Sequence, residues 1–375
     1  MKRAQYSTRT FPHPVLLAAL PAALALQWAA SRSPDLVERV YATALYPRLA
    51  LLLASVSGLV RFSVGEALLA ILAGTTLFGL ARLTCRVRAA KGQRLRLAGA
   101  AAARVLAAAG AVYLAFVLLW GLNYHRPPFA VITGLGTETT GVALAELEAL
   151  SADLVVAANQ ARTAVPEDAQ GVFRVAGGVS GVLARSLDAV RGASTRYTAL
   201  RGPFARPKPV LFSTGLSYLG ISGIYLPFTA EANVNDILPD SQLPFTAAHE
   251  LAHQAGIAPE DEANFVAYVA CTRHPEADFR YSGWFNAALY ALGALAQADA
   301  ERARRRWEEW SPAVRRDLAA LTAWNERYRG PAETAARAVN DAYLKSQGVP
   351  EGVRSYAGMV NLLILERRAR SAASR

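Results

Sequence analysis

Three long apolar runs lie in the first third of this 375-residue chain. Pro14–Ala30 contains a single polar residue, and Val105–Leu122 contains no charge. The core of the second run, Ala67–Ala81, is also uncharged, and Val64–Leu83 extends it by including one Glu and one Arg. A helix that crosses a bilayer needs roughly 17–25 apolar residues. The sequence therefore predicts about three transmembrane helices, near residues 14–30, 64–83 and 105–122.

Two alternatives to this count remain open. The first run could be a cleaved signal peptide, because it ends in small residues at positions 29–31. It is long for the apolar core of a signal, however, and further apolar runs follow. Leu49–Val60 is also apolar, and a span there would change the number of crossings. Because this stretch is short and contains two serines and a glycine, we expect a helix that lies on the outer membrane surface.

The positive charge of the chain belongs to this apolar part. Residues 1–104 contain 14 basic and three acidic residues, a net charge of +11, whereas residues 105–375 contain 26 of each. The predicted domain after the membrane is therefore neutral overall. It has no basic patch interleaved with aromatic residues, so the sequence argues against a nucleic-acid partner and leaves the lipid bilayer as the first predicted partner.

The basic residues also predict an orientation. Three of them precede the first run and six or seven follow the second, whereas the intervening loop, about residues 31–63, has four arginines and two acids. Loops rich in Lys and Arg stay in the cytoplasm. With three spans, everything after residue 122 then lies on the outer side of the membrane.

Residues 123–140 are rich in Pro, Gly and Thr and indicate a linker, which leaves residues 141–375 as one further domain. Its pattern is mainly helical, with two short apolar stretches between Pro, Gly and Ser that are typical of strands, Lys208–Phe212 and Ile221–Phe228. The fold class expected is α+β, mainly helical. The expected helices are Val142–Ala161, Phe245–Ala255, Glu260–Arg273, Gly283–Trp310, Pro312–Tyr328, Ala332–Ser346 and Tyr356–Arg370.

Residues 249–253 read His-Glu-Leu-Ala-His. On a helix, positions i and i+4 lie on the same face, so His249 and His253 can each offer a ring nitrogen to one Zn²⁺. Glu250 is rotated toward the next face, where it reaches a water molecule rather than the metal. The spacing therefore predicts two zinc ligands and a general base on a single helix.

Catalytic zinc sites have three protein ligands and one open position. Glu260, Asp261 and Glu262 follow the motif after a turn. Helical spacing places Glu262 on the face of Phe265, Val266 and Val269, which is the expected core face, and a buried carboxylate needs a partner. We therefore expect Glu262 to be the third ligand. The alternative, an acidic cluster that complements the helix dipole, suits Glu260 and Asp261 better.

His-Glu-x-x-His followed by a Glu on the next helix resembles the gluzincin class of zinc metallopeptidases. The wider sequence is similar to a bacterial membrane family catalogued as domain of unknown function 3810, over nearly the whole chain. The stretches that carry this resemblance are Trp120-Gly-Leu-Asn-Tyr-His-Arg-Pro-Pro, Gly223-Ile-Tyr-Leu-Pro-Phe-Thr-Ala-Glu-Ala-Asn-Val-Asn, Pro244-Phe-Thr-Ala-Ala-His-Glu-Leu-Ala-His-Gln, Glu260-Asp-Glu-Ala-Asn-Phe and Gly352-Val-Arg-Ser-Tyr.

The resemblance implies a zincin-like catalytic domain over residues 141–375, held in a bacterial cytoplasmic membrane and facing the periplasm or the extracellular side. It implies no particular substrate. One departure from most gluzincins is the short spacing, since eight residues separate His253 from Glu262. In zincin-like folds a strand placed like residues 221–228 forms the upper edge of the cleft and pairs with extended peptide or protein substrate. An ordinary internal strand is the alternative.

Peptide hydrolysis also needs a donor that stabilises the oxyanion. The available residues are His125, His274, Tyr225, Tyr281, Arg354 and Tyr356, of which Tyr356 is the first choice because it precedes a helix in a turn flanked by glycine.

The function expected is that of a membrane-anchored, zinc-dependent metallopeptidase. The alternative is a non-catalytic envelope protein with a structural or vestigial zinc site and a helical surface that binds partners. In that case a fourth protein ligand, His125 or His274, would close the site.

Overall fold

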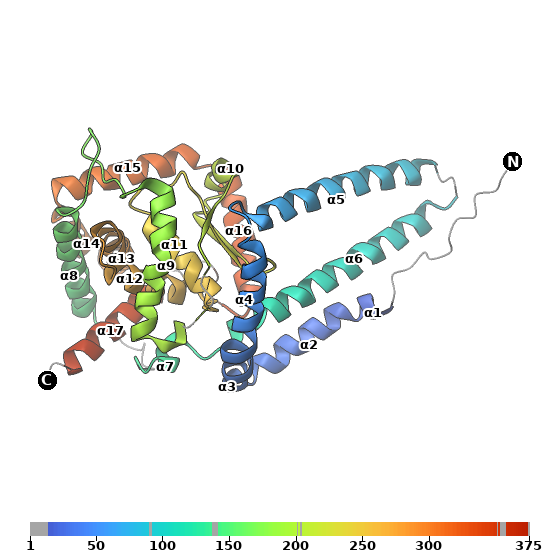
Figure 1. Cartoon of the computed structure of the whole chain (residues 1–375), viewed down its shortest axis with the longest axis horizontal. Helices are drawn as coiled ribbons and strands as arrows, with labels where there is room; N and C mark the ends of the chain where they lie inside the picture. Colours follow the sequence, from blue (N-terminus) through green and yellow to red (C-terminus); the bar gives the residue numbers. More distant parts are fainter. Residues whose placement is uncertain are drawn as a thin grey trace.

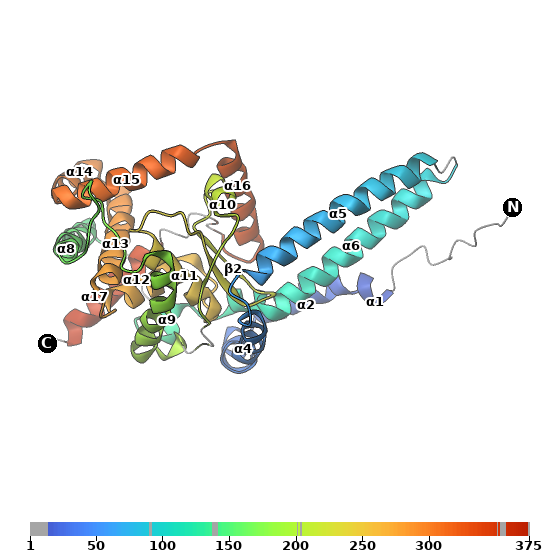
Figure 2. The same ribbon diagram turned by 45° about the horizontal axis from the view of Figure 1, so that its top comes forward.

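The structure is a computed structural model that describes residues 14–89, 92–136, 142–200, 202, 205–350, 352 and 358–373. It is mainly helical with one small sheet (Figure 1). The mainly helical α+β class expected from the sequence is therefore confirmed, as are apolar helices near the N-terminus. Most of the chain forms a body of packed helices, from which the N-terminal helices extend to one side (Figures 1 and 2).

The N-terminal part consists of six α-helices and one π-helical segment within the described residues. These are α1 (Pro14–Leu17), α2 (Ala19–Ser31), α3 (Pro34–Leu36), η1 (Val37–Leu45), α4 (Tyr46–Ser57), α5 (Val64–Ala89) and α6 (Arg94–Leu119). Both views show α2, α5 and α6 extending from the same side of the body with α4 at their base, and Figure 1 shows α3 there as well (Figures 1 and 2).

Three helices in the described residues are long and apolar enough to cross a membrane: Pro34–Ser57, Val64–Ala89 and Arg94–Leu119. The last two contain most of the predicted runs 64–83 and 105–122. The first predicted run, 14–30, is divided between the short helices α1 and α2. By length and composition, the third candidate span is instead the helix Pro34–Ser57. This helix includes most of Leu49–Val60, the apolar stretch that we expected on the membrane surface.

Helix α4 packs against the body at both of its ends. At its start, the Tyr46 hydroxyl donates to the carbonyl oxygens of His253 and Gln254, at 3.3 and 3.0 Å. At its end, Lys208 Nζ donates to the carbonyl oxygen of Ser57, at 2.6 Å. The buried face repeats at helical spacing and the opposite face is apolar and exposed; the buried side chains are Tyr46, Ala50, Ala54 and Ser57, and the exposed ones include Leu51, Leu52 and Val56. An amphipathic face of this kind suits a boundary between protein and lipid.

The body begins directly after α6. Its helices are η2 (Gly121–His125), α7 (Phe129–Ile132), α8 (Leu144–Arg162), α9 (Gly178–Arg196), η3 (Thr198–Leu200), α10 (Ser213–Tyr218), α11 (Leu243–Gln254), α12 (Glu260–Thr272), α13 (Ala277–Ala298), α14 (Ala300–Glu308), α15 (Pro312–Tyr328), α16 (Pro331–Ser346) and α17 (Met359–Ala373). The expected linker 123–140 therefore includes two short helices. The expected helix Gly283–Trp310 is two helices, because Asp299 caps a new one by accepting from the Arg302 backbone N–H.

The core lies where α11, α12 and α13 meet. All residues of α11 except His249 are buried, and so is α12 from Ala263 to Cys271. Helices α8, α9 and α17 complete this core around them. The motif helix α11 is thus held rigidly on several sides.

The sheet has three short strands in the order β1-β3-β2. Strand β1 (Lys208–Pro209) pairs parallel with β3 (Glu231–Val234), and β2 (Gly223–Leu226) pairs antiparallel with it, in the register Gly223↔Val234. Strand β3 is buried along its length but was not predicted, because Glu, Ala and Asn are poor strand formers. Among the described strands, β2 lies at an edge of the sheet.

A buried ion pair fastens the sheet to the N-terminus of α5. Glu231 accepts from the backbone N–H groups of Val64 and Gly65, at 3.0 and 2.7 Å. Its carboxylate also lies 2.6 Å from Lys208 Nζ. The first N–H groups of a helix have no partner within the helix, and a carboxylate satisfies them and complements the helix dipole. The bonds from Val64 and Gly65 attach α5 to the body, and the buried ion pair holds the Glu231 carboxylate in place to accept them.

Glu66 makes a second connection between α5 and the body. Its carboxylate accepts from the backbone N–H groups of Leu211 and Phe212, at 2.9 and 2.6 Å. The first turn of α5 is therefore fixed to the segment that follows β1.

Candidate metal centre

The motif lies on α11, whose ends are clearly defined. Pro244 stands in the first turn, where it is well tolerated. At the other end Gly256 has a φ of +87°, and its N–H donates to the carbonyl oxygen of His253 at 2.8 Å. The Ile257 N–H donates to the carbonyl oxygen of Ala252 at 3.1 Å, which completes the usual glycine stop. The chain then turns directly into α12.

The structure brings three side chains of the two helices together. His249 Nε2 and His253 Nε2 lie 3.0 Å apart. Glu260 Oε2 lies 3.2 Å from His249 Nε2 and 3.6 Å from His253 Nε2. Among the residues that the structure describes, these three form a group of His and carboxylate side chains close enough to share one metal ion.

Our expectation that Glu262 faces the two histidines is wrong in this structure, since Glu260 does so. Side chains tilt toward the N-terminus of their helix, so Glu260, the first residue of α12, extends back over the turn toward α11. Glu262 points elsewhere and accepts from the backbone N–H of Phe129 at 2.6 Å. Its buried carboxyl does have the partner that burial requires, but that partner is the start of α7. Burial and the charge of Asp261 raise the pKa of Glu262 to about 8.

The ring of His253 is oriented by its surroundings. Its Nδ1 lies 2.7 Å from the carbonyl oxygen of Ile257. A carbonyl can only accept, so Nδ1 carries the proton and Nε2 of the neutral ring keeps its lone pair for a metal. The Trp120 ring also contacts it in a T-shaped arrangement, with ring centroids 5.9 Å apart. His253 is thus held by a backbone acceptor and an aromatic contact.

The separations in this group fit a zinc ion. Zinc binds nitrogen and oxygen at about 2.0–2.2 Å, and ligands at the corners of such a tetrahedron lie ~3.3 Å apart. The three separations of 3.0, 3.2 and 3.6 Å bracket this value. Two histidines and one carboxylate form a ligand set that occurs in catalytic zinc sites. The residues present are therefore suited to hold Zn²⁺.

The charges of the three side chains are strongly coupled. Burial acts to lower the pKa of His253, but the Glu260 carboxylate outweighs it and raises that pKa to about 9. For Glu260 itself burial acts upward, and the two histidines outweigh it and hold the pKa well below its usual range. Glu260 is therefore ionised, as a metal ligand must be.

Glu250 lies beside this group in a buried position. Burial raises the pKa of its carboxyl to about 7, although the two histidines act to lower it. Within the described part of the chain, its Oε2 has no hydrogen-bond partner. A carboxyl with a pKa near neutrality is suited to take up and release a proton.

The space around Glu250 depends on a glycine in β2. A Cβ atom built on Gly223 would lie 2.5 Å from Glu250 Oε1, which is closer than van der Waals contact allows. With a side chain at position 223, either the Glu250 side chain or strand β2 would have to shift.

Replacing Gly223 with alanine is expected to displace the Glu250 carboxylate and to lower peptide hydrolysis by about 10–100-fold, because small misplacements of a catalytic group have effects of that size. Zinc content should remain that of the wild type, since the atoms nearest to the added Cβ all belong to Glu250, which is not one of the three ligands. The measurement is the hydrolysis rate beside the zinc content of the same preparation. An unchanged rate would show that the contact with β2 does not position Glu250.

The other residues considered from the sequence have different positions. The Tyr281 hydroxyl donates to the buried Asp317 carboxylate. His274 stacks on Phe279, and its Nδ1 accepts from the Glu276 N–H. His125 is not part of the three-residue group within the described chain. Tyr225 bonds through its hydroxyl to Tyr46, at 3.1 Å. The predicted oxyanion donor Tyr356, like Arg354, lies outside the described residues.

Two tyrosines near Glu260 were not singled out from the sequence. Burial and the Glu260 charge both raise the pKa of Tyr290. The same two causes act on Tyr343, whose pKa rises to about 12. Tyr343 belongs to α16 and lies 3.2 Å, oxygen to oxygen, from the hydroxyl of Tyr124. Nothing in the local sequence pattern links α13 and α16 to the motif, so only the fold shows that these hydroxyls lie near the ligand group.

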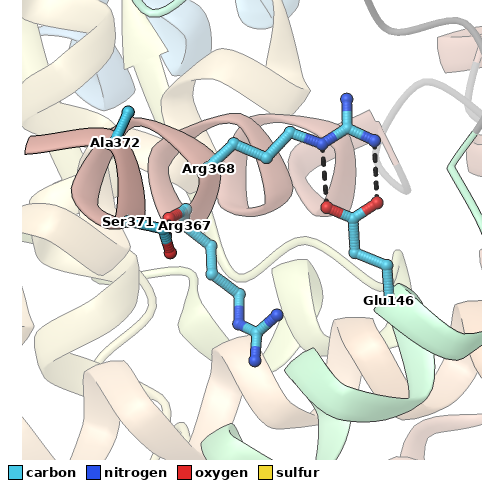
Figure 3. A pocket seen from close by; sticks show the side chains of 5 residues that line it. All are labelled: Glu146, Arg367, Arg368, Ser371 and Ala372. Carbon is cyan, nitrogen blue, oxygen red and sulfur yellow. Dashed lines mark hydrogen bonds and ion pairs between the residues drawn. The ribbon is translucent and has the colours of Figure 1, made fainter. Parts of the chain in front are cut away.

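A separate pocket of about 420 Å³ lies between α8 and α17, on the side of the body away from α5 and α6. Figure 3 shows the Arg368 guanidinium facing the Glu146 carboxylate, with nitrogen–oxygen distances of 2.8 and 2.7 Å. Arg367 points away from this pair and donates to Asp153 at 2.9 Å. These ion pairs fasten α17 to α8, and the arginines are thus engaged by the protein itself.

The apolar N-terminal helices, the helical body and the cluster on α11 and α12 define a mainly helical protein with candidate membrane helices. The chain belongs to the family described as "Protein of unknown function (DUF3810)", whose sequence profile matches residues 41–364. The match covers α5, α6, the sheet and the whole ligand group. No curated protein and no solved structure matches the chain.

Proposed function

We propose that this protein is a membrane-anchored, zinc-dependent metallopeptidase whose catalytic body lies on the outer side of a bacterial cytoplasmic membrane. The observation that supports this best is the convergence of His249, His253 and Glu260, with the buried Glu250 beside them on the same helix. The described residues offer three ligands. Three ligands leave a coordination position open, as in catalytic sites, whereas structural zinc takes four. This favours the enzyme over a structural or vestigial site.

A zinc ion held by these side chains supplies Lewis acidity, which polarises a peptide carbonyl and lowers the pKa of water to about 7. The Glu250 carboxylate accepts a proton from the attacking water and later donates it to the leaving amine. Water adds across the C–N bond, so the products are a carboxyl group and an amine. Because Glu250 lies on α11 beside His249 and His253, one carboxyl is placed for both proton transfers.

Strand β2 is the proposed binding site for the substrate backbone. It is an edge strand in the described sheet and lies against Glu250, with Gly223 beside the Glu250 side chain and the Tyr225 backbone N–H bonded to its carboxyl. An extended peptide that pairs with its free edge gains backbone hydrogen bonds that depend little on sequence. Such pairing would place a peptide bond close to Glu250.

We also propose a membrane arrangement for the N-terminal helices. Helices α2, α5 and α6 extend together and cross the bilayer, with α1 continuing α2 (Figures 1 and 2). Helix α4 contacts the body through both Tyr46 and Ser57. A helix fixed to the body at both ends cannot also cross the membrane, so α3, η1 and α4 lie along its outer surface. Three crossings with the basic loop inside then place the body outside.

The direct test of the function uses the full chain in detergent or lipid nanodiscs. We expect about one zinc ion per chain and hydrolysis of a mixture of unrelated peptides, followed by mass spectrometry. A chelator should abolish the activity and added Zn²⁺ should restore it, because two histidines and one carboxylate bind the metal reversibly. Zinc that is bound without hydrolysis would favour the structural or vestigial alternative, and absence of bound zinc would contradict the site.

The orientation is tested with reporter fusions. Alkaline phosphatase folds only where disulfides form, so we expect it to be active when fused after Arg375 and inactive when fused after Arg94. The reason is the difference in basic residues between the loops, since the large neutral body has no signal of its own that opposes export. The reverse pattern would place the body in the cytoplasm.

A further inference from the structure

The ligand group lies at the base of the apolar helices. Trp120 is the first residue after α6, and its ring contacts that of His253, with centroids 5.9 Å apart. The same ring contacts Tyr225 of β2, at 4.8 Å. Only one side chain therefore separates the end of a candidate membrane helix from a proposed zinc ligand.

Strand β2 connects the site to α5. Its first residue, Gly223, lies against Glu250, as the blocked Cβ position shows. Its last residue, Leu226, lies against the first turn of α5, because a Cβ on Gly65 would be 2.3 Å from Leu226 Cδ1. Figure 2 shows β2 beside the body end of α5. Strands rise about 3.3 Å per residue, so β2 spans ~10 Å from the general base to the start of this helix.

The surface around the start of α5 is suited to lie at the level of the membrane. Glu66 is hydrogen-bonded to the body, and an uncharged run begins at Ala67. The bonds of Glu66 place Leu211 and Phe212 at the same level, where their side chains are 86% and 64% exposed. Other exposed apolar residues at the adjoining chain segments are Leu59, Phe62 and Phe228. Apolar side chains exposed beside a lipid-facing helix suit insertion into the bilayer surface.

We propose, resting on the function proposed above, that the substrate is a peptide segment that emerges from the same membrane. Its extended chain pairs with the free edge of β2, and the bond that is cut lies about three to five residues from the bilayer surface, as the ~10 Å length of β2 requires. The reaction is hydrolysis, and water is the only co-reactant. The enzyme would thus cleave the membrane-proximal segments of membrane-anchored proteins or peptides faster than peptides free in solution.

The test uses the full chain with Zn²⁺, placed in lipid nanodiscs with a synthetic single-span helix. At both ends this helix has the same extension of repeating sequence, so that only distance from the bilayer distinguishes its peptide bonds. We expect cleavage, mapped by mass spectrometry, to cluster about three to five residues from the span. A matched substrate has a rigid helical spacer of ten residues, about 15 Å long, between the span and the repeat. In this substrate the repeat is still attached to the membrane span, but its peptide bonds lie farther from the bilayer. We expect the repeat to be cleaved at least tenfold more slowly, the size of effect expected for a mispositioned bond.

Cleavage spread evenly along the repeat, or equal rates with and without the rigid spacer, would overturn this proposal and leave the peptidase function standing. Glu250→Gln is the control in both assays. If neither substrate, nor the repeat peptide added free in solution, is cut in a way that depends on Glu250, the peptidase function fails and this proposal fails with it.

Discussion

Glu250→Gln is expected to lower peptide hydrolysis by about 10²–10⁴-fold, the usual contribution of a general acid–base group. Glutamine has the same shape but cannot accept the proton of the attacking water. Zinc content should be unchanged, because Glu250 is not one of the three side chains that converge on the metal position. The measurements are the hydrolysis rate and the zinc content of one nanodisc preparation.

The fold should tolerate this change well. The Glu250 carboxyl is buried, its pKa is raised to about 7, and within the described residues its Oε2 lacks a partner. Burial of an unpaired charge is unfavourable, so the neutral glutamine should unfold at the same temperature or higher. Glu326→Gln, on the exposed surface of α15, is the matched control and should keep full activity. Normal hydrolysis by Glu250→Gln would contradict the proposed role of this residue.

The sequence predicted most of the fold because its signals are local. Helical periodicity identified most of the longer helices of the body within a few residues, and the His-Glu-x-x-His spacing identified α11. Two of the missed features have a clear physical reason. Strand β3 is made of residues that favour strands only when the fold buries them. The break at Asp299 depends on a single capping hydrogen bond within a pattern that otherwise continues as a helix.

The third residue of the ligand group could not be chosen correctly by helical spacing. Spacing shows which residues of α12 share its buried face, and Glu262 does need a buried partner, as expected. It does not show whether that partner is a metal or the N–H of Phe129, which is distant in the sequence. The position of Glu260 follows from the tilt of side chains at a helix start and from how α12 packs on α11. Likewise, the contact of Trp120 with His253 joins the end of α6 to a motif that lies far later in the sequence, and no local pattern shows it.

The pair Glu260→Gln and Glu262→Gln separates the two candidate ligands. Glu260→Gln removes an ionised ligand, so zinc affinity should fall by more than about 100-fold, beyond the roughly 10–100-fold typical when an outer partner of a ligand is lost. Hydrolysis should be lost with the metal. Glu262→Gln should bind zinc like the wild type, because glutamine keeps an oxygen that accepts from Phe129 and the carboxyl it replaces has a pKa of about 8. Competition with a chromophoric chelator measures both affinities. Equal zinc binding by the Glu260 variant and the wild type, with loss in the Glu262 variant, would reverse the assignment and require α12 to sit differently on α11.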